Sequence, residues 1–188
     1  MRYEEFTIEG RNAVIEAYRA GRPIDKLFIL DGCQDGPILT IKREAKAKQT
    51  PVKFVTKERL DQLSETGKHQ GVIAYAAAYE YATVEEILDN ARQKGEAPFL
   101  FLLDNIEDPH NLGAIIRTAK LAGAHGVIVP KNRAAGLTAV VAKTSAGALN
   151  FTPVARVTNL AKTIEELKKE GIWFVCADMG GTTMYDLN

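Results

Sequence analysis

A polar segment that leads into a predicted helix has residue types that could bind an anionic ligand and act on it. Between positions 104 and 111 the chain carries Asp104, Asn105, Glu107, Asp108, Pro109, His110 and Asn111. Asn111 can cap the helix, because its amide oxygen can accept a hydrogen bond from a free N–H of the first turn. Gly113 and Arg117 are four residues apart and therefore share one helix face. Without a side chain, Gly113 would leave room beneath the Arg117 guanidinium for a sugar-phosphate.

Both residues also have an ordinary structural explanation. The apolar positions of this helix form a stripe that should face the core: Leu112, Ile115, Ile116 and Ala119. An arginine beside such a stripe is commonly a solvated surface residue, and an asparagine at the start of a helix is commonly only a cap. The spacing alone leaves both interpretations open.

The elements around this segment predict a parallel sheet with helical crossovers. Residues 99–103 (FLFLL) and 172–177 (IWFVCA) are continuously apolar, as expected for strands buried on both faces, and shorter strands are predicted at 126–129 and 154–157. Helices are predicted at 111–122, 137–149 and 160–170. In such sheets ligands bind beyond the carboxyl ends of the strands. Two loops have that position, residues 104–111 and 178–184.

The N-terminal part reads as a separate, smaller α/β unit. Helices predicted at 10–21 (capped by Asn12), 37–49 and 57–64 alternate with strands predicted at 26–30, 52–55 and 72–78. A further helix, capped by Thr83 and extending to Gln93, precedes a turn-rich joint. We therefore expect a first domain at 1–75, a linker region at 76–97 and a second domain at 98–188.

Composition excludes several classes of protein. The 188 residues are 46% hydrophobic and 26% charged, which excludes collagen-like and fully disordered chains. Lys plus Arg and Asp plus Glu both number 24, so no overall basic field indicates a nucleic-acid partner. Cys33 and Cys176 have no metal-ligand spacing. No signal peptide or apolar run of membrane-spanning length is present in the sequence, so we expect a cytoplasmic protein without a membrane partner.

Charge is nevertheless unevenly distributed. Between Lys42 and Arg59 there are seven basic and two acidic residues, a local net charge of +5. This run predicts either a solvated helix face or a patch that binds nucleic-acid phosphates. Lys68, His69 and Gln70 precede a predicted strand and could extend such a patch.

The run LDNIEDPHNLGAIIRTAKLAGAHGVIVP (103–130) resembles the first motif of the SpoU family of RNA ribose 2′-O-methyltransferases, also called the TrmH family. The resemblance continues through KTSAGAL (143–149), PVARVTNL (153–160) and IWFVCAD (172–178). GRNAVIEAYRAGRPIDKLFI (10–29) and KHQGVIA (68–74) resemble the small RNA-binding domain that many members carry. The two-domain layout is most similar to the RlmB-type branch, which methylates a guanosine ribose in large-subunit ribosomal RNA.

The resemblance implies an α/β knot (SPOUT) fold, in which the C-terminal segment forms a trefoil knot, an exception to the usual absence of knots. It also implies S-adenosylmethionine as cofactor, RNA (ribosomal RNA in this branch) as partner, and a homodimer that completes each site. Arg117 would be the catalytic arginine and Asn111 its positioning partner. A guanidinium stays protonated at working pH. We therefore interpret Arg117 as a cation that binds the target phosphate and stabilises a developing alkoxide, and less readily as a base.

The remaining residues that the resemblance assigns fall into two groups. Cofactor contacts are expected from the loop after the last predicted strand: Asp178, Met179 and Gly180. RNA contacts are expected from the first domain: Lys42, Arg43, Lys46, Lys48, Lys68, His69 and Gln70.

The sequence departs from the family pattern at its C-terminal end. The family's second motif, a Gly-rich loop with a glutamate, and its third, with a Ser-Leu-Asn run, would lie beyond Asn188. We therefore expect an incomplete methyltransferase domain and an inactive fragment, and we favour truncation over a protein unable to bind the methyl donor. Two alternatives remain, a non-catalytic RNA-binding module and an unrelated nucleotide-binding α/β protein. The second is disfavoured because the sequence has neither GxGxxG nor a P-loop.

Overall fold

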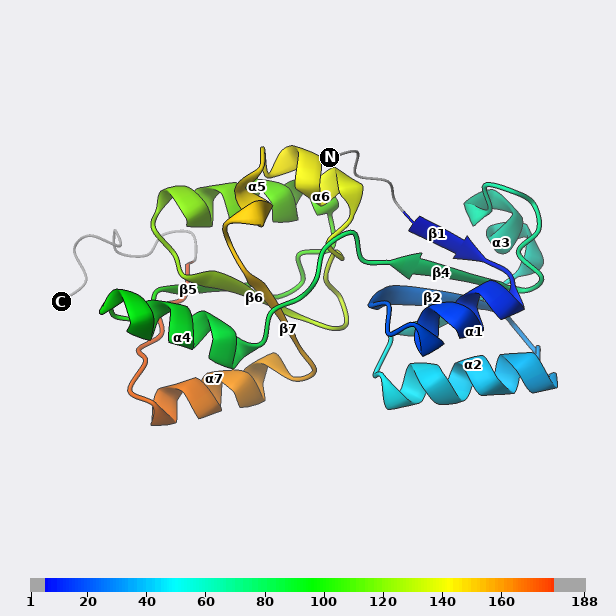
Figure 1. Cartoon of the computed structure of the whole chain (residues 1–188), viewed down its shortest axis with the longest axis horizontal. Helices are drawn as coiled ribbons and strands as arrows, with labels where there is room; N and C mark the ends of the chain where they lie inside the picture. Colours follow the sequence, from blue (N-terminus) through cyan, green and yellow to red (C-terminus); the bar gives the residue numbers. More distant parts are fainter. Residues whose placement is uncertain (1–5, 178–188) are drawn as a thin grey trace.

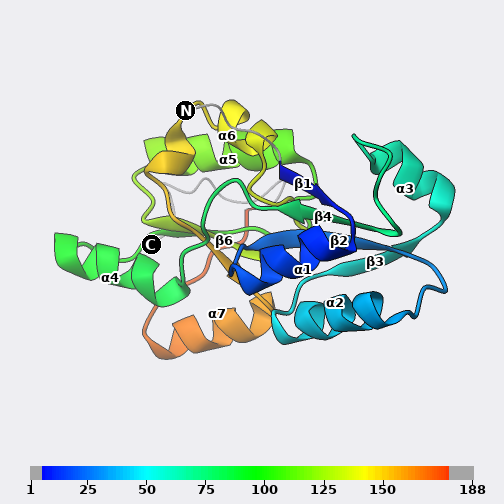
Figure 2. The ribbon, with the colours of Figure 1, turned by 45° about the vertical axis from the view of Figure 1, so that its right-hand side comes forward.

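The computed structural model describes residues 6–177, with only the backbone of Phe6. Its first domain is built on one mixed sheet (Figure 1). The strands are β1 (Phe6–Glu9), β2 (Ile24–Leu30), β3 (Val52–Val55) and β4 (Val72–Ala76), in the order β1-β4-β2-β3. β4 runs antiparallel to both neighbours, whereas β2 and β3 are parallel. Figure 2 shows β3 beside β2, above the crossover helix α2 (Gly36–Ala47) that joins them.

Helices cover the two faces of this sheet unequally. α1 (Arg11–Arg19) and α2 bury one face, where Leu27 and Ile29 of β2 join the core. The short helix α3 (Lys57–Leu63) lies on the other face and packs Leu60 against Phe28. Since successive residues of a strand point to opposite faces, Lys26 lies on the same face as Phe28. α3 covers only part of that face, and the remainder is directed towards the second domain.

The second domain is a three-stranded parallel sheet between two layers of helices (Figure 1). β5 (Leu100–Leu102), β6 (Gly126–Pro130) and β7 (Val154–Val157) pair in that order. α5 (Pro109–Leu121), α6 (Ala139–Thr144) and the 3₁₀ turn η1 (Ala148–Asn150) cover one face. α4 (Val84–Lys94) and α7 (Leu160–Lys169) cover the other. The α/β class with a parallel sheet is therefore as predicted.

Most predicted elements are present, and the differences have local causes. The capping by Thr83 is confirmed, since its hydroxyl accepts from Glu86 N at 3.2 Å. α1 is preceded by Gly10 and not capped by Asn12, and β1 was not predicted at all. The helix predicted over 137–149 is broken between α6 and η1, because Ala146 and Gly147 take positive φ angles of 50° and 85°.

Neither of the two apolar runs, 99–103 and 172–177, is the strand buried on both faces that the sequence had predicted. β5 is an edge strand of the described sheet, its three residues are half-buried, and Phe99 before it is 37% exposed. Residues 172–177 are not in a strand: Ile172 and Phe174 pack inward, whereas Trp173 is 93% exposed. No strand in the described part of the chain pairs with this segment, and it buries only alternate side chains.

Across residues 6–177, every helix is too short or too polar to cross a membrane.

Candidate functional site

The residue that caps α5 is not the one predicted from the sequence. Asp108, not Asn111, caps the helix, and its carboxylate accepts a hydrogen bond from His110 N at 3.0 Å. Pro109 then fits the first helical position, because it has no N–H to leave unsatisfied and its φ is already helical. Asn111 consequently lies inside the first turn with its side chain exposed. It is free to contact a ligand, but it does not cap the helix.

Gly113 does not leave a gap under Arg117, as the sequence had suggested. A Cβ at position 113 would lie 1.8 Å from Thr144 Oγ1 and 3.0 Å from Ser145 N. The space is filled by α6, which packs directly on the α5 backbone. Gly113 is therefore a contact point between two helices, and glycine is needed there for close approach.

Arg117 lies on the outside of α5. Leu112, Ile116 and Ala119 are fully buried, whereas Arg117 is exposed. Within residues 6–177 it forms no ion pair or side-chain hydrogen bond, so its charge faces solvent. Six positions separate Asn111 from Arg117, which places the two side chains about 120° apart around the helix and about 9 Å apart along it. A ligand that meets both must lie beside the first three turns of α5.

Two loops meet at the carboxyl ends of the strands. Ala135 N, in the loop after β6, donates to Ile106 O in the loop after β5 at 2.7 Å. This is the edge at which open parallel sheets bind ligands. In this chain the first domain lies against part of this edge, since Lys26 and Lys53 line the same cleft as Glu107 and Lys131.

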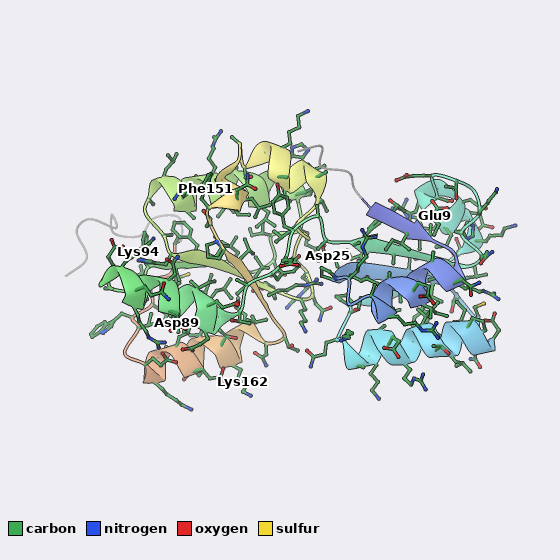
Figure 3. The ribbon with its side chains drawn as sticks, in the orientation of Figure 1. Glu9, Asp25, Asp89, Lys94, Phe151 and Lys162 are labelled. Carbon is green, nitrogen blue, oxygen red and sulfur yellow. The ribbon has the colours of Figure 1, made fainter. Side chains whose placement is uncertain are left out.

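A buried ion pair joins the two domains. Asp25 of β2 is 7% exposed, and Figure 3 shows it at the junction between the domains. Arg156 of β7 places Nη1 2.6 Å from Asp25 Oδ1, and its Nη2 donates to Asp25 O at 2.7 Å. Tyr81 OH donates to Asp25 Oδ1 at 2.7 Å and accepts from Leu137 N at 3.1 Å. Burial, followed by the negative charge of Asp25, raises the pKa of Tyr81, so this hydroxyl stays protonated.

Beside this ion pair a cleft of about 370 Å³ lies between the domains. Its lining includes charged side chains from both of them: Asp25, Lys26, Lys53, Glu107, Lys131, Arg133 and Arg156. None of Lys26, Lys131, Arg133 and Arg156 is among the residues predicted from the sequence to bind a ligand. The only sequence signal for Lys131 and Arg133 is that they directly follow a parallel strand.

The residues predicted to bind RNA are not gathered in one place. Gln70 Oε1 accepts from Arg11 N at 3.3 Å, and Arg11 also pairs with Asp35, the cap of α2, at 2.7 Å. Lys68–Gln70 therefore lie near the start of α2, whereas Lys46 and Lys48 lie at its other end, roughly 18 Å away for a helix of this length.

Several of these side chains make contacts within their own domain. His69 is buried, with Nε2 2.9 Å from Asp61 Oδ1 and Nδ1 accepting from Gly71 N at 3.0 Å. Lys42 Nζ donates to Cys33 O at 2.9 Å and lies 5.0 Å from the centroid of the Phe54 ring. Lys46, Lys48 and Lys68 are exposed, as is Arg43, whose guanidinium lies 4.0 Å from Glu44. Asp178, Met179 and Gly180, predicted to contact the cofactor, lie outside the described residues.

Comparison with known proteins assigns both domains. Residues 7–82 match the family described as RNA 2′-O ribose methyltransferase substrate binding, and residues 98–188 match the SpoU rRNA Methylase family.

Relatives match along most of the chain. "Putative TrmH family tRNA/rRNA methyltransferase YacO" of Bacillus subtilis (strain 168) is 48% identical over 169 residues, which are 90% of this chain and 68% of that protein. A "Putative TrmH family tRNA/rRNA methyltransferase" of Staphylococcus aureus (strain MSSA476) is 45% identical over 182 residues. The match covers 97% of this chain and 73% of that protein.

Solved structures are more distant. The SpoU methyltransferase AviRb from Streptomyces viridochromogenes, in complex with AdoMet, is 21% identical with a TM-score of 0.43. The match covers 89% of this chain and 59% of that one, so the chain spans about three-fifths of the length of this solved structure. The two family matches and the 48% identity show that the chain belongs to the SpoU (TrmH) family of RNA methyltransferases.

Proposed function

We propose that this chain is part of an enzyme that uses S-adenosylmethionine to methylate a ribose 2′-hydroxyl in structured RNA, with ribosomal RNA as the substrate. The family assignment supports this proposal, since one chain carries both the substrate-binding and the methylase parts. The observation that carries it furthest is the position of Asn111 and Arg117. Both are exposed within the first three turns of α5, the helix that follows the loop at the carboxyl end of β5.

Arg117 acts in this proposal as a fixed positive charge. Methyl transfer to a ribose oxygen requires that the 2′-hydroxyl lose its proton, and negative charge develops on that oxygen. A guanidinium without a carboxylate partner in residues 6–177 can stabilise this charge or hold the adjacent phosphate. Asn111 orients the same nucleotide through its amide. The cofactor supplies the methyl group, and Asp178, Met179 and Gly180 are the residues we assign to its binding.

A homodimer is part of the same proposal. The outer surface near the end of α5 exposes two large apolar side chains, Leu121 at 83% and Phe151, just after η1, at 71%. A second copy that covered them would bring another chain close to the exposed side of α5. The proposal places the enzyme in the cytoplasm, where its RNA substrates are.

Replacement of Arg117 tests the proposal. In a protein of the relatives' full length, Arg117→Ala should lower the rate of methyl transfer to ribosomal RNA by about a hundredfold or more. Its free energy of unfolding should change by no more than about 0.5 kcal/mol, because the side chain is exposed. Lys94→Ala, at an exposed position of α4 on the other face of the sheet, is the control and should retain activity.

Two results would contradict the proposal. A lower melting temperature for Arg117→Ala, together with an unchanged specific activity, would make Arg117 structural. Binding of RNA by the wild-type protein without any transfer of a methyl group would favour the RNA-binding module. Arg117→Lys separates two roles: residual activity indicates charge stabilisation, whereas none indicates bidentate phosphate binding or the base role.

A further inference from the structure

The cleft between the domains has an excess of positive charge that the protein does not neutralise. Five cationic and two acidic side chains line it, whereas the whole chain has a net charge of zero. Arg156 is already paired with Asp25. Within residues 6–177, no carboxylate lies within ion-pairing distance of the other four cations, which are Lys26, Lys53, Lys131 and Arg133.

The lysines in this cleft are close enough to disfavour one another's charge. Burial lowers the pKa of Lys26 and the charge of Lys53 lowers it further, while the charge of Glu107 opposes them without reversing the direction. Burial also lowers the pKa of Lys131, with a second contribution from Arg156. Lys131 Nζ has a neutral partner, Gln49 Oε1, at 2.7 Å. An anion that entered the cleft would relieve these unfavourable interactions.

The floor of the cleft alternates basic and aromatic side chains on one face of the first sheet. Lys26 lies opposite Tyr75 in the β2–β4 pairing, and Phe28 lies opposite Lys53 in the β2–β3 pairing. The rings of Phe28 and Tyr75 pack edge to face, with centroids 5.4 Å apart and planes at 72°. Cations beside an aromatic ring suit an unpaired nucleic-acid strand, because phosphates meet the cations and a base can stack on the half-buried Tyr75. Phe28 is 9% exposed and supports that ring from the core side.

The opposite wall belongs to the segments that build the candidate catalytic site. Glu107 and Pro109, at the start of α5, line the cleft, as do Lys131 and Arg133 after β6. The cleft therefore continues to the first turn of α5, where Asn111 is exposed. An RNA strand held in it would pass directly by that turn.

We propose that the cleft between the domains binds the phosphates of an unpaired RNA strand next to the target nucleotide, through Lys26 and Lys53 of the first domain and Lys131 and Arg133 of the second. This inference rests on the proposed function, in which the substrate is RNA. It differs from the sequence prediction, which placed RNA binding on the lysines of α2. Those lysines do not line the cleft.

Two double variants and one control test the inference on the 188-residue chain. Lys26→Gln/Lys53→Gln removes the charges of the first domain. Lys131→Gln/Arg133→Asn removes those of the second, with asparagine chosen because Arg133 has a φ of 54°, which asparagine tolerates. Lys46→Gln/Lys48→Gln on α2 is the matched control, since it removes the same charge from exposed positions.

The measurement is the dissociation constant for an unstructured oligouridine of 20 nucleotides, between 50 and 200 mM salt. We expect each cleft pair to weaken binding about tenfold or more. Each should also reduce the slope of log K against log salt by about 1.4, which is 0.7 for each of the two phosphates that the variant no longer neutralises. The control should change the dissociation constant by less than about twofold and leave the slope unaltered. Thermal unfolding followed by circular dichroism should show that all three variants are folded.

Three results would overturn the inference. The first is an unchanged salt slope in both cleft variants. The second is an equal loss of affinity in the α2 control. The third is complete displacement of the RNA by millimolar inorganic phosphate at constant ionic strength, which would indicate a site for a small anion. Because the readout is affinity and not methyl transfer, failure here is distinguishable from failure of the proposed function, which Arg117→Ala tests.

Discussion

The two predicted functional helices, α2 and α5, begin alike and lie in different surroundings. Each starts with an aspartate cap followed by an early proline: Asp35 accepts from Ile38 N at 3.2 Å, and Asp108 accepts from His110 N at 3.0 Å. Each follows a parallel strand. The start of α5 contributes to the cleft between the domains, whereas the start of α2 is at the end of the first domain that points away from it (Figure 1).

Polar groups at the start of α2 are paired with one another. Arg11 contacts both Asp35 and Gln70. Glu9, the last residue of β1 and two positions before Arg11, accepts a hydrogen bond from Ser64 Oγ at 2.6 Å. Burial alone would raise the pKa of Glu9, but hydrogen bonds from Ser64, Thr66 and Glu65 outweigh it and lower the pKa to about 2. At the start of α5, by contrast, Asn111 is exposed and Arg117 is unpaired within residues 6–177. Under the proposed function, a strand end whose polar groups have no internal partners marks the binding site, and a helix rich in charge does not.

The largest expected effect concerns packing, because only α5 has a glycine on its buried face. Gly113→Ala should lower the free energy of unfolding by about 3 kcal/mol, at the upper end of the usual cost of overpacking, since the added Cβ meets the Thr144 side chain and the Ser145 backbone. Gly36→Ala, at the first position of α2, is the control: a Cβ there meets nothing within 4 Å. Urea denaturation measures both. Equal values would mean that the space beside Gly113 is open, as the sequence had suggested.

The caps should differ by a smaller amount. Asp108→Ala should cost about 1 kcal/mol, the usual value for a lost helix cap. Asp35→Ala should cost about 2 kcal/mol, because it also removes the ion pair with the half-buried Arg11. A double-mutant cycle with Arg11→Ala isolates the ion pair. A greater loss for Asp108→Ala than for Asp35→Ala would contradict the view that the start of α2 is the more internally bonded of the two.

The smallest effect separates the lysines of α2 from one another. Lys42→Gln should lower the free energy of unfolding by about 0.5–1 kcal/mol, because it removes a hydrogen bond to Cys33 O and a cation–π contact with Phe54. It should not weaken the binding of oligouridine. Lys46→Gln, at an exposed position, should leave stability within about 0.5 kcal/mol. If Lys42→Gln lost RNA affinity without losing stability, α2 would be part of the RNA-binding site, as predicted from the sequence.

Sequence periodicity predicted the helices and strands well where the pattern of apolar residues within one short segment is enough to specify the element. β6 is preceded and followed by clear helical patterns, and its range, Gly126–Pro130, differs from the predicted 126–129 by one residue. The resemblance identified the family through a run of 28 residues that spans the loop after β5, then α5 and β6. Such runs are informative because each strand and helix is specified by its own neighbours in sequence.

Features that depend on distant contacts were not predictable in the same way. Whether residues 172–177 form a strand depends on a neighbour that could hydrogen-bond to them, which their own apolar pattern does not specify. The space beside Gly113 is filled by Thr144, 31 positions later. The cations of the cleft come from β2, β3, β7 and the loop after β6, so no window of sequence contains them together.

The ion pair between Asp25 and Arg156 has a consequence for how a target nucleotide is selected. Removing one partner of a buried pair typically costs about 3–5 kcal/mol, and salt screens buried charges much less than exposed ones. The distance between the cleft and Arg117 is therefore set by the protein and should be the same at low and high ionic strength. Under the proposed function, the enzyme would select a nucleotide by its distance along the strand from the bound phosphates. Salt would change how much RNA is bound without changing which nucleotide is methylated.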